Sequence, residues 1–116
     1  MRVEVEVRLR TATDAEDLWD MVRDPQSWPP MPGADLTYRV FEAARPRLLR
    51  YALVGGLPVR DHEGVARLEP SGAGGTEIIL HESFRARLWG TAGYLRGRRE
   101  RALVDLARVW AGGLAP

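Results

Sequence analysis

The sequence predicts an α+β fold in which a curved antiparallel sheet of about five strands grips one long C-terminal helix. Three observations lead to this fold class. Apolar residues recur at every second position in five segments, as in strands with one buried face. Short turns rich in glycine and proline join the last four segments, which makes those neighbours antiparallel. Near the C-terminus the apolar spacing changes to three, four and seven residues, which is typical of an amphipathic helix.

The first strand is predicted over residues 2–10, where Val and Leu alternate with Arg and Glu. Two short helices follow it. Thr13 and Glu16 have the capping-box spacing expected at the start of the first helix. Asp24 can cap the second, with Pro25 at its first position, where a missing N–H costs nothing. The prolines after Trp28 then end that helix.

The remaining strands are predicted over residues 36–42, 47–54, 59–69 and 76–85, with a turn over 70–75. The long helix is predicted from an apolar stripe, and two consecutive glycines can end it. The stripe comprises Leu88, Ala92, Leu95, Ala102, Leu103, Leu106, Val109 and Trp110, and the glycines are Gly112 and Gly113. An antiparallel sheet with one apolar face needs a cover, and this helix is the only element large enough.

Composition narrows the class of protein. The chain of 116 residues fits a single domain, residues 1–116, with 45% hydrophobic and 28% charged residues. A net charge of +1 gives no reason to expect a nucleic-acid partner. There is no cysteine, no apolar run long enough for an integral membrane segment and no signal-peptide pattern, so we expect a cytoplasmic protein without disulfides. No metal-ligand spacing or phosphate-loop motif is present, and we expect no metal and no cofactor.

The order of these elements resembles the helix-grip fold of the START-related, Bet v 1-like (SRPBCC) superfamily, and within it the bacterial polyketide cyclase/dehydrase and lipid transport group. The resemblance rests on the opening strand, the segment "TDAEDLWDMVRDPQSWPPMPG" and the segment "RLLRYALVGGLPVRDHEGVARLEPSGAGGTEIILHESF". It covers nearly the whole chain. It implies a cavity between the sheet and the long helix that holds a small hydrophobic molecule.

One departure from the family pattern concerns the sheet edge. Family members usually carry an additional hairpin after the Trp/Pro/Gly segment, whereas Gly33 here runs almost directly into the next predicted strand. We therefore expect five strands instead of the usual six or seven. The pocket is then either smaller, or open and covered by a second copy of the chain, which makes a homodimer a further hypothesis.

Aromatic side chains on the first part of the sheet are candidate ligand-binding residues. Trp28 either anchors the core or forms one wall of the cavity. Tyr38 and Tyr51 share the period of the apolar positions on their strands, so both hydroxyls can point inward, where a buried phenol needs a hydrogen-bond partner. The alternative is that each is a rim tyrosine or is satisfied by the backbone.

His62 and Glu82 are the polar candidates on the later strands. His62 is in phase with Gly64 and two small or apolar residues, which leaves room beneath the helix, and a histidine is suited to proton transfer near neutral pH. Glu82 shares an inward set with Ile78, Leu80 and Phe84, and a buried carboxylate must be paired or neutral. We expect Arg50 or Arg67 as its partner if it is buried, or water if it lies at a strand end.

Trp89 and Tyr94, at the start of the long helix, either belong to the core or line the mouth of the cavity. The arginines within residues 96–101 are expected to form a solvated helix face, with an acidic partner or anionic lipid as the minor alternative. The ligand-binding set is therefore Trp28, Tyr38, Tyr51, His62, Leu80, Glu82, Trp89 and Tyr94.

Three functions are open at this stage. The first is binding or transport of a small hydrophobic ligand, such as a lipid, a quinone or a polyketide-like aromatic. The second is a polyketide cyclase/dehydrase-type lyase, with His62 or Tyr51 as proton carrier and Arg50 stabilising an enolate. The third is a protein-interaction or dimerisation module without a ligand. No convergent set of acids and bases is apparent, so the sequence favours the binding protein.

Overall fold

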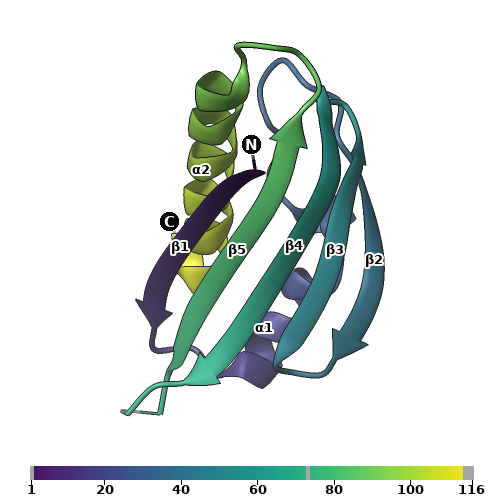
Figure 1. Cartoon of the computed structure of the whole chain (residues 1–116). Coiled ribbons are helices and arrows are strands. Elements are labelled where there is room, and N and C mark those ends of the chain that lie inside the picture. The colour runs from purple at the N-terminus through teal and green to yellow at the C-terminus, as the bar shows by residue number, and fades with distance from the viewer. Residues whose placement is uncertain (1, 73, 114–116) are drawn as a thin grey trace.

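The computed structural model of the chain describes residues 2–72 and 74–113 (Figure 1). Strand β1 (Arg2–Thr11) leads into helix α1 (Ala15–Val22) and a single 3-10 turn, η1 (Pro25–Ser27). Four strands follow: β2 (Thr37–Ala44), β3 (Leu48–Gly55), β4 (Val59–Pro70) and β5 (Thr76–Ala86). Helix α2 (Ala92–Arg108) and a π-helical turn, η2 (Val109–Gly113), complete the described chain.

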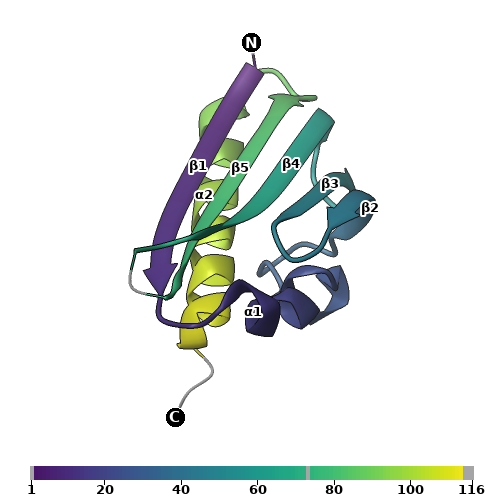
Figure 2. The same cartoon turned by 90° about the horizontal axis from the view of Figure 1, so that it is seen from below.

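Over the described residues the sheet has five strands in the order β1-β5-β4-β3-β2, and every neighbouring pair is antiparallel. Both helices lie on the same face of this twisted sheet, α2 along β1 and β5 and α1 at one end (Figures 1 and 2). The predicted α+β helix-grip arrangement, with five antiparallel strands and a long C-terminal helix, is therefore confirmed. Among the described helices, none is long and apolar enough to cross a membrane.

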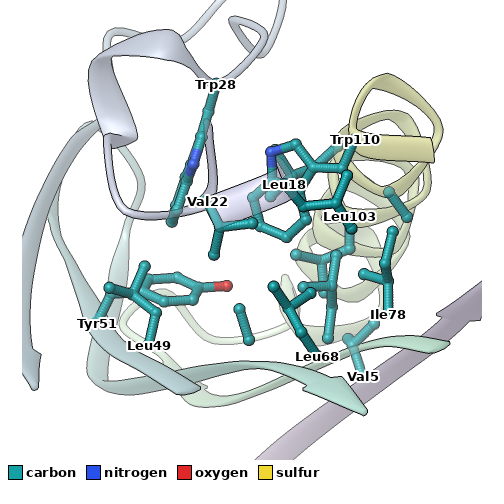
Figure 3. Close-up of a cluster of buried hydrophobic side chains, with 14 of the residues drawn as sticks. Val5, Leu18, Val22, Trp28, Leu49, Tyr51, Leu68, Ile78, Leu103 and Trp110 are labelled. Carbon is teal, nitrogen blue, oxygen red and sulfur yellow. The ribbon is translucent and has the colours of Figure 1, made fainter. Parts of the chain in front are cut away.

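The core lies between the inner face of the sheet and the two helices (Figure 3). Its side chains come from the positions that alternate inward along each strand and from one stripe of each helix. In Figure 3, Trp28 lies above Tyr51, whose hydroxyl points into the interior, and Trp110 closes the side near α2. Charged pairs such as Arg2–Glu63 and Arg8–Glu77 line the outer face, which explains the strict alternation along β1.

The prediction for the start of α1 is wrong. The helix begins at Ala15 with Asp14 at the N-cap, and no side chain caps it. Thr13 lies outside the helix because its carbonyl accepts a hydrogen bond from the Thr76 hydroxyl at 2.7 Å, which ties this residue to the sheet. The second cap is confirmed, since the Asp24 carboxylate accepts a hydrogen bond from the Gln26 N–H at 3.1 Å.

The long helix begins later than predicted, at Ala92, and the apolar pair Leu88 and Trp89 precedes it in the connection from β5. Both side chains are exposed, Trp89 completely. The predicted end is confirmed, because η2 ends at Gly113 and Gly112 has a φ of 109°, a left-handed conformation that glycine adopts without strain.

Candidate functional site

A buried ion pair joins the sheet to α2. Glu82 of β5 and Arg99 of α2 are 0% and 1% exposed. Arg99 donates from Nε to Oε1 of Glu82 at 2.7 Å and from Nη2 to Oε2 at 2.6 Å. This is the two-pronged geometry in which a guanidinium matches a carboxylate best. The pair lies in the middle of the space that the sequence predicted as a cavity.

Two further side chains from neighbouring strands converge on the same carboxylate. Tyr51 of β3 donates its hydroxyl proton to Oε2 of Glu82 at 2.5 Å. Nε2 of His62, on β4, lies 3.0 Å from Oε1. That approach is too bent for a hydrogen bond, so Nε2 has no such partner among the described residues, and the contact is electrostatic. Glu82 is therefore surrounded by donors.

The hydrogen bond at the other ring nitrogen of His62, Nδ1, determines which nitrogen carries the ring proton. Nδ1 accepts a hydrogen bond from the backbone N–H of Leu53 at 2.9 Å. An acceptor nitrogen carries no proton, so the ring proton lies on Nε2, facing Glu82. The bond also has a structural role, because the pairing of β3 with β4 ends at Tyr51 and Gly64, so that Leu53 is paired with Tyr38 of β2 on one side but with no residue of β4 on the other. His62 fills this opening between the two strands.

Tyr38 of β2 is the member of the site nearest to solvent. Its hydroxyl accepts a hydrogen bond from Nη1 of Arg99 at 3.1 Å, and its ring centroid lies 5.7 Å from the guanidinium carbon. Among the described residues its hydroxyl proton is donated to no acceptor. The side chain is half-buried, whereas the other members of the cluster are buried.

Trp28 covers the two tyrosines. Its ring centroid lies 4.9 Å from that of Tyr38 and 5.0 Å from that of Tyr51, both in edge-to-face contact. Its indole N–H donates to the carbonyl of Met21 at 3.2 Å, which fixes the ring in place. Trp28 is 7% exposed, and it is both a core residue and one wall of this site. The two roles considered for Trp28 from the sequence, core anchor and wall of the site, therefore do not exclude each other.

Burial and charge set the protonation of the cluster. Burial alone would raise the pKa of Glu82, but Arg99, through its charge and its hydrogen bonds, lowers it to about 2. Burial first, and the nearby Glu82 charge second, raise the pKa of Tyr51 well above its ordinary value, and burial also raises that of Tyr38. Near neutral pH the site thus contains one carboxylate, one guanidinium and two neutral phenols, with no net charge.

Arg99 is the functional residue that sequence reasoning missed. It was expected on a solvated helix face with the other arginines of residues 96–101, and that expectation is wrong for this position. The partner predicted for Glu82 was wrong as well: Arg50 pairs with Glu42 at 3.2 Å and is exposed, and Arg67 is also exposed. A signal was present, because position 99 lies four residues after Leu95 and four before Leu103, both buried.

The structure brings five of the predicted residues together and leaves the others apart. Trp28, Tyr38, Tyr51, His62 and Glu82 share the cluster. Leu80 is fully buried in the core two positions along β5. Trp89 and Tyr94 are exposed at 100% and 64%, and Tyr94 contacts Arg98 instead of the cluster. Their assignment to the core is wrong.

Two hollows on the described part of the chain are relevant to ligand binding. A groove of about 640 Å³ crosses the outer face of the sheet, with Arg2, Phe41, Ala52 and Ser83 among its lining residues. A smaller hollow of about 260 Å³ lies between the proline-rich segment 29–32 and α2. Arg98 spans its edge by donating to the carbonyl of Pro32.

The cluster offers hydrogen-bond donors and apolar surface. No group of three or more metal-ligating side chains occurs among residues 2–72 and 74–113. Glu82 is already surrounded by its three neighbours, and Nδ1 of His62 is occupied, so neither is free to accept a proton from a substrate. The donors that remain are Nε2–H of His62, the Tyr38 hydroxyl and the N–H groups of Arg99 beyond those already bonded. Such a site can bind and orient an oxygen atom.

Known proteins resemble this chain in three-dimensional structure but not in sequence. No protein-family model and no curated protein matches the sequence. Among solved structures, the chain is similar to the Zhui aromatase/cyclase from a Streptomyces species, with 15% identity, a TM-score of 0.74 and coverage of 97% of this chain and 93% of that one. It is also similar to a START superfamily protein from Mycobacterium smegmatis, with 17% identity, a TM-score of 0.73 and coverage of 94% of both chains.

Proposed function

From the START-like helix-grip fold of the SRPBCC superfamily, which this chain has, we propose that the protein binds a small hydrophobic molecule at the cluster between the sheet and α2. The observation that carries the proposal is the buried Glu82–Arg99 pair with its two tyrosines. A buried ion pair adds little net stability, and well-packed apolar side chains of similar volume are often as stable or more so. The pair is therefore better explained by a role in recognition than by a role in folding.

The ligand reaches the cluster beside the proline-rich segment. This segment, residues 29–32, connects Trp28 to the turn before β2 and rests against α2 across the 260 Å³ hollow. It is held there by the contact of Arg98 with Pro32 and by the buried side chain of Met31. Displacing these contacts moves the segment that directly follows Trp28 without breaking any strand pairing. Apolar surface removed from water drives binding, at about 25 cal/mol per Å².

The proposal is binding and not catalysis. A cyclase of the type suggested by the sequence needs a proton carrier. In that hypothesis Arg50 stabilises the enolate of the substrate. Arg50 lies on the outer face, paired with Glu42, and the two groups at the cluster most suited to carry a proton are engaged. The similarity to an aromatase/cyclase concerns the fold, and function in such a fold depends on the site.

The test is native mass spectrometry of the protein purified from its own host, followed by denaturing extraction of bound molecules. We expect a hydrophobic adduct at one molecule per chain. The site is then located by adding the extract to ¹⁵N-labelled protein and following the Trp28 indole and Arg99 Nε–H resonances. Shifts confined to Arg2 and Ser83 would place the ligand in the outer groove and contradict the proposed location. No adduct, and no thermal shift with lipids, quinones or aromatics, would contradict the function itself.

A second candidate is self-association through β2. This strand is the last in the sheet order, so one of its edges is unpaired, and it exposes Val40 and Phe41. A second copy of the chain pairing along this edge would replace the hairpin that the sequence lacks. Sedimentation equilibrium of the wild type and of a Val40→Lys variant tests it. A monomer for the wild type at high concentration rules out this pairing.

A further inference from the structure

The connection between β5 and α2 carries a tryptophan that no other part of the described chain covers. Trp89 is 100% exposed, and its neighbours Leu88 and Tyr94 are 56% and 64% exposed. None of these three side chains belongs to the core between the sheet and the helices. Large apolar side chains are unfavourable in water, and burial against a partner removes that cost. This end of the chain therefore has the character of an interaction surface.

Hydrogen bonds hold Trp89 at the apex of a tight turn. The N–H of Thr91 donates to the carbonyl of Leu88 at 3.3 Å, and the Thr91 hydroxyl donates to the same carbonyl at 2.6 Å. Gly90, the third residue of the turn, has a φ of 83°, as in a type II turn, where glycine adopts this conformation without strain. The backbone thus presents the indole outward in a fixed position.

The segment around this turn is basic. Residues 83–99 contain five arginines and no aspartate or glutamate. Two of the five have acidic neighbours: Arg99 is buried against Glu82, and Arg85 lies 3.9 Å from Asp61. The other three form no ion pair with any described residue, and they are Arg87, Arg96 and Arg98. Their charges are available to a partner outside the chain.

Acidic residues gather at the opposite end of the sheet. Residues 14–24, which include α1, contain five acidic residues and one arginine. Helix α1 follows the end of β1, whereas the turn follows the end of β5, where Arg85 pairs with Arg2 at the start of β1. In Figure 1 the two segments lie at the lower and upper ends of the molecule. The net charge of +1 hides this separation, which orients the turn toward an anionic surface.

We propose that the turn 88–91 docks the protein on an anionic lipid surface, with Leu88 and Trp89 inserted between the head groups and the three unpaired arginines beside the lipid phosphates. Tryptophan is enriched at membrane–water interfaces, where its ring lies at the level of the head groups. Arginines next to such an insertion strengthen binding to anionic lipid. The inference is independent of the proposed ligand site, because it uses none of the residues of the cluster.

The shape of the turn favours a bilayer over a folded protein as the partner. A side chain that is exposed on all sides is convex, so Trp89 forms no groove into which a peptide could bind. A protein partner would have to supply a pocket that matches the indole and excludes water around it. Lipid head groups separate around a single ring and need no such pocket.

Vesicle sedimentation with the full chain tests the proposal. One set of vesicles contains phosphatidylcholine and phosphatidylglycerol in a ratio of about 7:3, and a second set contains phosphatidylcholine only. At a salt concentration of about 0.05 M we expect the chain to bind the anionic vesicles, and to bind the neutral ones at least about tenfold more weakly. Raising the salt to about 0.5 M should weaken binding to the anionic vesicles, because salt screens the arginine charges.

Two pairs of variants localise the contact. Trp89→Gln is expected to lower the partition coefficient at least about tenfold, whereas Phe41→Gln, which removes a ring that is 65% exposed on β2, leaves it unchanged. Arg87→Gln is expected to lower it about fivefold. Arg67→Gln makes the same change in net charge on the half of β4 that is farther from the turn, and leaves it within about twofold. All four positions are exposed, and circular dichroism verifies that the variants fold.

The results that overturn the proposal are distinct. Absence of binding to anionic vesicles at low salt overturns it outright. Equal losses in Arg87→Gln and Arg67→Gln overturn it as well, since the chain would then respond to net charge alone, and so do equal losses in Trp89→Gln and Phe41→Gln. If the chain binds labelled polyglutamate but no vesicles, and Trp89→Gln abolishes that binding, the turn is a site for an acidic protein instead. None of these results depends on whether a ligand binds at the cluster.

Discussion

Removing either member of the Glu82–Arg99 pair is predicted to destabilise the fold strongly, whereas removing both costs no more than removing one. In Arg99→Met, the carboxylate of Glu82 stays buried with only Tyr51 and His62 beside it. In Glu82→Gln, the guanidinium stays buried without a counter-charge. Each single variant leaves one uncompensated charge in the interior, and the double variant leaves none.

The magnitude can be worked from two directions. Breaking a buried pair by removing one partner typically costs about 3–5 kcal/mol. Independently, lowering the pKa of Glu82 from 4.5 to about 2 corresponds to about 3 kcal/mol of preferential interaction with the carboxylate. The two agree, so we expect a loss of about 3–5 kcal/mol for each single variant and a smaller loss for Glu82→Gln/Arg99→Met, because the double variant leaves no unpaired charge. The coupling between the two positions is then about 3 kcal/mol or more.

The assay is urea unfolding at pH 7, followed by tryptophan fluorescence and circular dichroism, for the wild type and the three variants. Coincident transitions from both probes establish two-state behaviour. If a single variant does not fold, Arg99→Lys replaces Arg99→Met, because it keeps the charge and loses the two-pronged geometry. Additive losses, with the double variant near the sum of the singles, would refute the reasoning, because they would mean that the two charges do not stabilise each other.

Three further predictions follow from local geometry. Gly64→Ala is expected to lower the free energy of unfolding by about 2–3 kcal/mol, because a Cβ there would lie 2.3 Å from the ring of Tyr51. Gly97→Ala, within α2 and with no neighbouring atom within 4 Å, is expected to raise it by about 0.5–1 kcal/mol. Urea unfolding measures both. Trp28→Phe is expected to lower stability by about 1–2 kcal/mol and Trp89→Phe to leave it unchanged, and equal effects would contradict the burial of one and exposure of the other. Since the pKa of Glu82 is lowered in the folded chain, its contribution to stability is complete above pH 4.5 and is lost as pH falls toward 2. Urea unfolding between pH 2 and 6 should therefore show a fall in the free energy of unfolding of the wild type that Glu82→Gln lacks.

The first strand could be predicted because it has one face in water. Along β1, Val3 and Val5 are buried and Arg2 and Glu4 are exposed, so the period of two is visible in the letters themselves. The starts of the two helices were harder to predict from the sequence. Thr13 has the capping-box pattern, but its carbonyl is taken by Thr76, a residue 63 positions away, and no local pattern contains that contact.

The candidate site could be predicted in part. The inward phase of Tyr51, His62 and Glu82 was visible from period two, and their convergence followed from the pairing of β3, β4 and β5. From the sequence, the partner of the Glu82 carboxylate was expected on a neighbouring strand, as Arg50 or Arg67. Arginines on the outer face satisfy the outer carboxylates instead, as Arg50 does with Glu42.

The sequence nevertheless contained the information that pairs Glu82 with Arg99. Glu82 interrupts the apolar set of β5 between Leu80 and Phe84, and Arg99 interrupts the apolar stripe of α2 between Leu95 and Leu103. A charge on a buried stripe is too costly to remain alone, so each interruption requires an opposite charge on the element that faces it. Among the described elements, α2 packs along β1 and β5, and Arg99 is the one of its described arginines that is buried with its apolar stripe. Two polar interruptions of opposite sign on facing apolar stripes therefore predict a contact between the two elements.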